Sequence, residues 1–358
     1  MRTFTIGALG RKIDVRNLLG NVLWHKGREM ANRESTKRNY VELQKRWGTA
    51  FTPVGGDGVD IDQALRDAGL NWKVERRPVL VPQSDGSTVE AEDFKANVRS
   101  DTGEVLGITG NSWTPVQNEQ HVELANQLIK AGDMNWVGLG LGRNGRSVHA
   151  LMELDKEIKI GGDKDEEIWP LVQFRQGHDG GLSVVVEVTP LRFVCVNGMR
   201  VPVADYTYAW KVRHTSGIQD KIADISKSVN LITHYYKRLP EIGDKLVTMR
   251  VDDHYWERFL ERLIPLPNYA VEDESKGGRA LTMAHNRREK LTDVWRTTDN
   301  LENIRNTRWG ALQAVCAFHD HHTTIRKTPN RSLENAAFER ASMPAAIKTR
   351  AVQLLLEA

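Results

Sequence analysis

The sequence predicts an α+β fold: an antiparallel β-meander backed by a long helix, with helical N- and C-terminal parts. Two observations predict it. Between residues 72 and 213, apolar stretches with the period of strands alternate with turn sequences. From Ser216 onward, apolar residues recur with the spacing of helices. The chain has 358 residues, of which 40% are hydrophobic, so it is long enough to bury a sizeable core around these elements.

Charge divides the chain into three predicted regions: a basic N-terminal segment (residues 1–59), an α+β core (60–267) and a basic helical C-terminal region (268–358). Residues 1–59 hold 11 Lys or Arg against 5 Asp or Glu. Residues 276–350 hold 14 against 7, although the whole chain carries a net charge of only +3. Basic ends around an acidic centre indicate either a polyanion partner or ends that dock on the centre.

Four elements are expected before the meander. They are a helix from Asp60 to Gly69, a strand from Trp72 to Val81, a hairpin of residues 93–99 and 104–109, and a helix from Asn118 to about Ala131. Asn118 has the side chain of a helix N-cap, and the glycine that follows Ala131 is expected to end the helix.

Five strands are expected in the meander, at residues 135–142, 147–160, 169–176, 182–195 and 205–213. The first two flank Asn144-Gly145, the strongest short-range signal of a hairpin. In the last strand, the period of two places Tyr206, Tyr208 and Trp210 on one face and Lys211 and Arg213 on the other. The aromatic face is expected to join the core, which leaves the two cations exposed.

A heptad seam marks the long helix, which is predicted to run from Ser216 to Leu239 and to end at Pro240. Its apolar residues are spaced four and three apart: Ile218, Ile222, Ile225, Val229, Ile232, Tyr236 and Leu239. So narrow a seam suits a partner helix, from the same chain or from a neighbouring subunit. We therefore predict a homo-oligomer larger than a dimer, at least when DNA is bound, with packing on the protein's own sheet as the alternative.

Toward the C-terminus, a second amphipathic helix is expected at residues 252–263 and stops before two prolines. Residues 268–280 are rich in Gly, Glu and Lys, which predicts a linker or surface loop. A further helix is expected at residues 303–318.

Four motifs are candidates for a catalytic, metal or nucleotide-binding site. His178-Asp179 could supply two metal ligands, yet Asp-Gly is ordinary turn chemistry and a hydrolytic metal site usually needs three protein ligands. His319–His322 stands at a helix end, where neighbouring side chains diverge. Cys195 lacks a nucleophile signature, and Gly138–Gly145 leads into a strand where a phosphate loop needs a helix. No catalytic residue, metal ligand or cofactor is therefore predicted.

Cations on successive strands favour nucleic acid as the partner. Cations that track phosphates and aromatic rings that stack on bases together form the usual platform for a single strand. The residues predicted to contact single-stranded DNA are Arg175, His178, Arg192, Lys211, Arg213, His214 and Trp113. The alternative is that the aromatic rings belong to the core and the cations are only solvated.

Ordered motifs along most of the chain resemble the phage/plasmid-like family catalogued as domain of unknown function 932. They are Leu23–His25, Ala64–Pro78, Trp113–Asn118, His178–Gly180, Thr189–Asn197, Val212–Thr215 and Thr307–Ala314. The family pattern usually reads Asn-Thr where this chain has Asn197-Gly198. The resemblance implies a setting in phages, prophages and plasmids, near replication, recombination or anti-restriction genes, and it implies no particular reaction. The predicted layout is also similar to the core of single-strand annealing proteins such as RecT and Red-beta.

Residues and resemblance together predict a phage or mobile-element protein that binds single-stranded DNA and supports annealing or recombination without enzymatic activity. One alternative is a metal-dependent nuclease that uses His178 and Asp179, and another is an accessory protein that binds a host defence enzyme. The chain has two cysteines, no signal-peptide pattern and no apolar run of about 20 residues. We therefore expect a cytoplasmic protein of the bacterial host cell that makes no membrane contact.

Overall fold

The structure is a computed structural model, and it describes the greater part of the chain. The described residues are 4–5, 12–13, 43, 45, 47–54, 60–162, 166–192, 197–198, 209–222, 224–266, 274–325, 332–342 and 345–357. Most of the predicted basic N-terminal segment, Tyr206, Tyr208 and Cys195 lie outside them.

A six-stranded antiparallel sheet forms the centre, in the order β15-β12-β11-β8-β7-β3. Its strands are β3 (Phe51–Pro53), β7 (Met134–Gly142), β8 (Ser147–Leu154), β11 (Leu171–Gly177), β12 (Val184–Val188) and β15 (Ala209–Val212). The six strands stand side by side in the order in which they follow along the chain. The predicted α+β class and antiparallel meander are thereby confirmed.

Two predicted meander strands are each divided between two sheets. A four-stranded sheet in the order β14-β13-β10-β9 takes their second halves, with strands β9 (Ile158–Ile160), β10 (Glu166–Trp169), β13 (Leu191–Arg192) and β14 (Asn197–Gly198). Pro190 separates β12 from β13, because a proline has no N–H to continue the ladder. Two short strands, β1 (Phe4–Thr5) and β2 (Lys12–Ile13), pair with each other.

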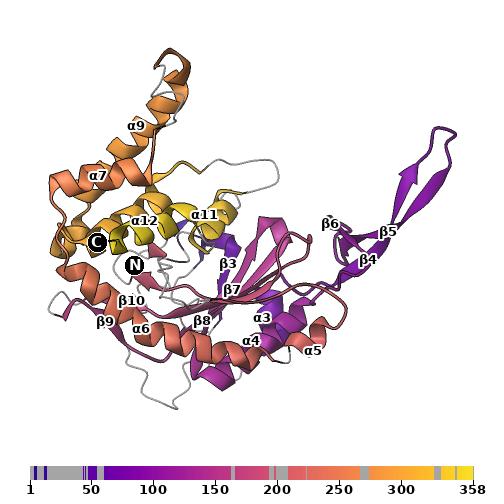
Figure 1. Cartoon of the computed structure of the whole chain (residues 1–358). Helices are drawn as coiled ribbons and strands as arrows, with labels where there is room; N and C mark the ends of the chain where they lie inside the picture. Colours follow the sequence, from indigo (N-terminus) through magenta and orange to yellow (C-terminus); the bar gives the residue numbers. More distant parts are fainter. Residues whose placement is uncertain are drawn as a thin grey trace.

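A three-stranded sheet extends away from this body, and we call it the arm. It comprises β4 (Val74–Pro82), β5 (Thr88–Arg99) and β6 (Val105–Gly110), in the order β4-β5-β6. The predicted strand and hairpin are confirmed, and β5 begins earlier than predicted and pairs along β4 as well. Figure 1 shows the β4–β5 hairpin projecting far beyond the rest of the molecule.

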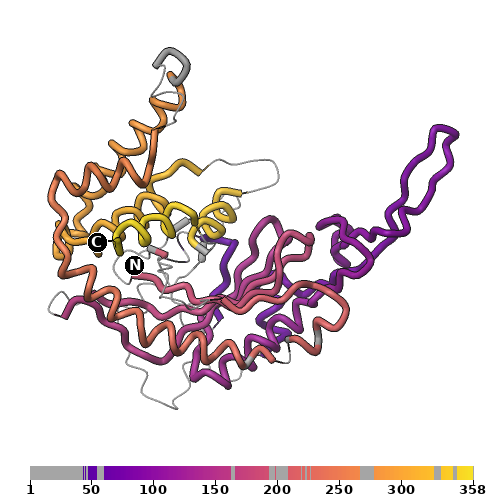
Figure 2. Tube along the Cα trace, viewed as in Figure 1, coloured from indigo at the N-terminus to yellow at the C-terminus, as the bar shows by residue number. Residues whose placement is uncertain are grey.

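Helices cover both faces of the central sheet (Figure 1). They are α3 (Ile61–Asp67), α4 (Asn118–Gly132), α5 (Ile218–Ile222), α6 (Ser228–Thr248), α7 (Asp253–Leu263), α9 (Glu274–Thr297), α10 (Arg308–Ala317), α11 (Leu333–Ser342) and α12 (Ala346–Leu356). The larger apolar core lies between the sheet, α4, α6 and the C-terminal helices. A smaller one, around Trp47, Phe51 and Phe338, lies beside α11 on the other face. Figure 2 traces the chain from the arm to the C-terminal helices on the opposite side.

The long helix differs from its prediction in two ways. It is divided into α5, a 3₁₀ turn at Ile225–Lys227 and α6, and Pro240 lies inside α6 instead of ending it. Buried leucines on both sides of the proline, Leu239 and Leu246, hold the helix against the core across the missing hydrogen bond. The predicted stop was therefore wrong, because burial outweighed the local cost of proline.

The heptad seam is filled by the protein's own chain. Ile218, Ile225, Ile232, Tyr236 and Leu239 are buried in the larger core of a single copy. The Tyr236 hydroxyl also donates a hydrogen bond to the carbonyl of Leu171 on β11. The alternative of packing on the protein's own sheet is the observed one, so the seam no longer supports a contact between subunits.

Three other helices begin at residues that differ from the predicted ones. Residues 274–280, predicted as part of a linker, begin helix α9. The helix predicted at 303–318 is a 3₁₀ turn followed by α10, which the Thr307 side chain caps by accepting from Gly310 N–H. Gln117, and not Asn118, caps α4, in a reciprocal capping box with Gln120.

Gly243 is required where α6 crosses β9. A Cβ there would lie 2.5 Å from two carbon atoms of Ile160. We expect Gly243→Ala to destabilise the protein by about 1–3 kcal/mol in urea unfolding, although alanine favours helices. The matched control is Gly278→Ala in α9, where a Cβ meets nothing within 4 Å. That change should stabilise by up to about 1 kcal/mol, and equal effects at the two sites would contradict the close-packing explanation.

Candidate nucleic-acid interface

The two strand arginines predicted to contact DNA are buried. On β11, the Nε of Arg175 lies 2.5 Å from Oε1 of Glu187 on β12. On β13, the Nη2 of Arg192 lies 2.7 Å from Oε1 of Glu166 on β10. A buried cation whose charge is matched by a carboxylate cannot also meet a phosphate. The prediction that Arg175 and Arg192 contact DNA is corrected on this ground.

His178 is buried as well, in the turn between β11 and β12. Its Nε2 lies 3.0 Å from Oδ1 of Asn118, and its backbone carbonyl accepts from Asn97. Burial, together with His214 and Arg99, lowers the pKa of His178 to about 3, so the ring is neutral at pH 7. A neutral, enclosed imidazole does not attract phosphate, which corrects the prediction of a DNA contact at His178.

Asp179 is bound to a different partner from His178. Its carboxylate lies 2.6 Å from Nη2 of Arg143 and accepts from the N–H of Gly181, while Gly180 adopts a φ of 79°. His178 and Asp179 therefore stabilise a turn and do not converge on one point. Among the described residues, no group of three or more His, Cys, Asp and Glu could hold a metal ion.

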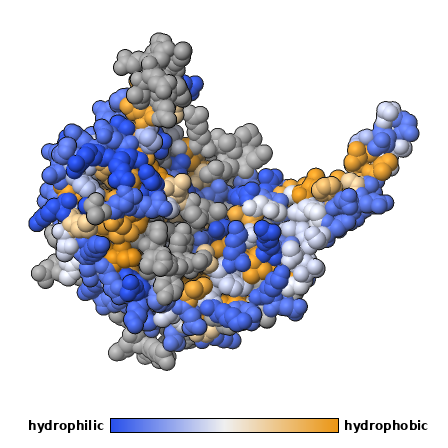
Figure 3. All heavy atoms as spheres, viewed as in Figure 1, coloured by the Kyte–Doolittle hydropathy of each residue, from blue (hydrophilic) through white to orange (hydrophobic). Residues whose placement is uncertain are grey.

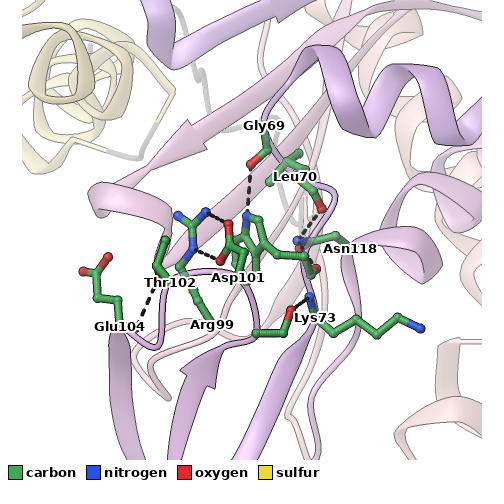
Figure 4. A network of polar contacts seen from close by, with 10 residues as sticks. Gly69, Leu70, Lys73, Arg99, Asp101, Thr102, Glu104 and Asn118 are labelled. Atoms are coloured by element: carbon green, nitrogen blue, oxygen red, sulfur yellow. Dashed lines mark hydrogen bonds and ion pairs between the residues drawn. The ribbon is translucent and has the colours of Figure 1, made fainter.

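A polar network fixes the base of the arm to the body (Figure 4). Asn118 donates to the carbonyls of Leu70 and Trp72, and the Trp72 indole donates to the carbonyl of Gly69. Arg99 stacks over the Trp72 ring, 4.4 Å from its centroid, and pairs with Asp101. These bonds join β4, the β5–β6 turn and the start of α4, so the arm leaves the body in a defined direction.

Trp113 and His214 meet beside this base. Their rings stack with centroids 4.9 Å apart, and Nδ1 of His214 lies 3.0 Å from the carbonyl of Thr114. Arg76 lies over the Trp113 ring, 5.8 Å from its centroid. Burial lowers the pKa of His214, so this ring also supplies a neutral face. Trp113 is half-buried.

The two remaining predicted contacts, Lys211 and Arg213, are exposed. Lys211 lies on β15, the outer strand of the six-stranded sheet, and Arg213 follows two residues later. Extended backbone places both side chains on one face, and His214 is the next residue along the chain. We call Trp113, Lys211, Arg213 and His214 the edge cluster. The structure thus brings Trp113 into contact with His214, at the end of the strand segment that carries the two exposed cations.

Two other motifs make structural contacts within the protein. His319–His322 belong to a π-helical turn, where Asp320 lies 2.6 Å from the buried Lys348 ammonium and burial lowers the pKa of His319 to about 4. Gly138 and Gly140 lie against the rings of Phe51 and Phe338. The glycine-rich stretch therefore makes room for close packing in β7.

A buried polar row on β8 and β11 escaped the sequence analysis. Ser147 Oγ lies 3.0 Å from Nε2 of His149, whose Nδ1 lies 2.8 Å from Nε2 of Gln173. A glutamine N–H donating to Nδ1 leaves the imidazole proton on Nε2, so His149 donates to the serine and cannot accept its proton. Ser147 and His149 are each 1% exposed, so this row orders the interior of the sheet. Its signal was two polar residues at alternate positions of an otherwise apolar strand.

These features define an α+β protein whose strand and turn motifs are held in buried polar contacts. The family described as Domain of unknown function (DUF932) matches residues 105–341, more than half of the chain, and the chain belongs to that family. No curated protein and no solved structure matches. The similarity of layout to RecT and Red-beta therefore has no support. Among the described residues, no helix is long and apolar enough to cross a membrane.

Proposed function

We propose that this protein binds single-stranded DNA of a phage or other mobile element at the edge cluster and does not cleave it. The supporting observation is the half-buried Trp113 ring, stacked on His214, with the exposed Lys211 and Arg213 just before His214 in the chain. An aromatic ring beside paired cations fits one base and its neighbouring phosphates. Annealing or recombination would then use strands that are held extended along the outer edge of the sheet.

The roles of the four residues differ. Lys211 and Arg213 supply charge to the phosphates, whereas Trp113 supplies the stacking surface. His214 is neutral and holds the indole in place from behind. Arg76 adds positive potential, because its guanidinium stays charged while it anchors the loop through the carbonyl of Gly110 at 2.8 Å.

The test is a salt series of single-stranded DNA binding, read by fluorescence anisotropy. Lys211→Ala and Arg213→Ala should each reduce the slope of log affinity against log salt by about 0.7, because each removes one phosphate contact. Trp113→Ala should cost about 1–3 kcal/mol of affinity, and Trp113→Phe should retain most of it.

The matched control is Lys245→Ala, an exposed lysine at the far end of α6, which should leave the slope unchanged. No cleavage is expected with magnesium, manganese or zinc, because His178 and Asp179 are engaged by Asn118 and Arg143. Absence of binding at about 50 mM salt, or an equal effect of all three cation variants, would contradict the proposal.

A further inference from the structure

The arm exposes an unusual amount of apolar surface. Among the described residues, eight large apolar side chains are exposed, and six of them belong to the arm. They are Leu80, Val81, Val89, Phe94, Val105 and Ile108, each 45–58% exposed. Figure 3 shows hydrophobic residues near the base of the arm and again toward its tip. Contiguous apolar surface of this kind on a projecting element indicates a site for another protein surface.

Register groups four of these side chains at two places along the arm, on either side of a β-bulge between Pro78 and Leu80. Toward the tip, Val81 on β4 lies directly opposite Val89 on β5, so these two side chains share a face. Nearer the base, Phe94 shares a face with Ile108 on β6, because Ile108 lies directly opposite Ala96, two residues after Phe94. We call Val81, Val89, Phe94 and Ile108 the arm stripe.

The arm presents these side chains and not the backbone edge of β4. This strand, one of the two edges of the sheet, contains Pro78 and Pro82, which have no N–H to offer an added strand. The network around Trp72 and Asn118 holds the base (Figure 4). Docking by side chains on the stripe therefore fits better than extension of the sheet by a partner strand.

The charge of the arm restricts the partner. Residues 78–95 hold four carboxylates, at Asp85, Glu90, Glu92 and Asp93, against the single Lys95, a net charge of −3. An acidic surface repels nucleic acid, so the arm is not a second DNA site. It suits a partner surface that is apolar and basic.

Helix α9 offers such a surface. Its exposed residues Arg279, Met283, Arg287 and Lys290 recur at intervals of four, four and three, which aligns them on one face. Met283 is 55% exposed. Residues 278–297 hold five Lys or Arg against two Asp or Glu, a net charge of +3. The opposite face is fixed by Leu291 and by Trp295, which stacks on Trp256 at 4.7 Å.

We propose that the arm stripe of one copy docks on the exposed face of α9 of a second copy. Figure 1 shows the arm and α9 projecting from different sides of the molecule. The arm of one copy therefore cannot reach α9 of the same copy. Because two different surfaces meet, the contact is head-to-tail and repeats into a ring or a filament. The homo-oligomer predicted from the heptad seam thus acquires a different interface.

Charge reversal tests this contact. The arm variant carries Glu92→Lys and Asp93→Lys, and the helix variant carries Arg287→Glu and Lys290→Glu. Wild type should form species above the monomer mass of 40.5 kDa at about 10 μM by light scattering, a concentration at which a micromolar contact is largely formed. Each variant alone should be monomeric. Their equimolar mixture should assemble again, because each acidic arm then meets a basic helix and each basic arm an acidic one.

Two controls keep the result specific. Lys237→Glu with Lys245→Glu reverses two exposed charges on α6 and should leave assembly unchanged. Val89→Asp places a charge in the arm stripe and should give a folded monomer, with folding checked by circular dichroism. A monomeric wild type, or a mixture of the two reversal variants that stays monomeric while both are folded, would overturn the proposal. A host protein as the occupant of the arm would give the first of these results.

Discussion

Replacing Arg192 by methionine is expected to destabilise the protein by about 3–5 kcal/mol, because the change leaves Glu166 buried without its counter-charge. Both side chains are 1% exposed. Asn303 donates to the same carboxylate at 2.8 Å, so the ion pair also joins the small sheet to the turn before α10. Loss of the arginine should therefore loosen the contact between the sheet and the C-terminal helices.

Urea unfolding measures the loss of stability, and two further variants serve as controls for its cause. Arg77→Met removes one member of an exposed pair with Glu75 and should cost at most about 1 kcal/mol. The double change Arg192→Met with Glu166→Gln removes both buried charges and should recover part of the loss. A cost for Arg192→Met no greater than that for Arg77→Met would refute the assignment of a buried structural ion pair.

The same ion pairs show where sequence reasoning about the site failed. Alternation along β11 and β13 located Arg175 and Arg192 on strands, but not the partners of their charges. Glu187 reaches Arg175 across a hairpin, a neighbour that the turn alone could have suggested. Glu166 reaches Arg192 only because β10 and β13 pair in a second sheet. Which cations remain free for DNA depends on this register.

Local sequence signals predicted the helices and strands better than they predicted the tertiary contacts of those elements. Apolar alternation gave the meander strands, and Asp60 caps α3 as its position before the helix suggests. Pro240 and the heptad seam misled, because burial of α6 on the sheet outweighed proline cost and the seam suits a sheet as well as a helix. The stack of Trp113 on His214 unites residues about a hundred positions apart, which no local pattern encodes.

The arm also shows that a local sequence pattern does not identify the contacts of an element. Val81 and Val89 are apolar residues directly opposite each other on β4 and β5, and both are exposed in a single copy. An apolar pattern in a sequence indicates that a face is buried, but it does not identify the surface that buries it. For that reason, an apolar face left bare by its own chain is informative about assembly.

Lowering the pH from 6.5 to 5 is expected to destabilise the protein steeply, through His121 and His178. Burial lowers the pKa of each to about 3, whereas a histidine in the unfolded chain titrates near 6.5. Between these values the unfolded state binds more protons, so stability is complete above pH 6.5 and falls as the pH falls toward 3. Each histidine contributes about 1.4 kcal/mol per pH unit in that window.

His121→Phe isolates one of the two contributions. The imidazole of His121 stacks on Phe174 with centroids 4.1 Å apart, and a phenyl ring can keep that contact without titrating. We expect the variant to lose about 1.4 kcal/mol per pH unit less than wild type between pH 6.5 and 5, measured by urea unfolding at each pH. Restricting the range to pH 5 and above limits the contribution of carboxylates.

Val122→Ala, on the same helix and also buried, is the matched control. It should lower stability by a similar amount at every pH, because a cavity costs free energy without binding a proton. If His121→Phe kept the wild-type dependence on pH, the imidazole would already be charged in the folded protein. A charged ring would need a partner anion in the core between α4 and β11, and the stacking against Phe174 would then have to be reinterpreted as a cation–π contact.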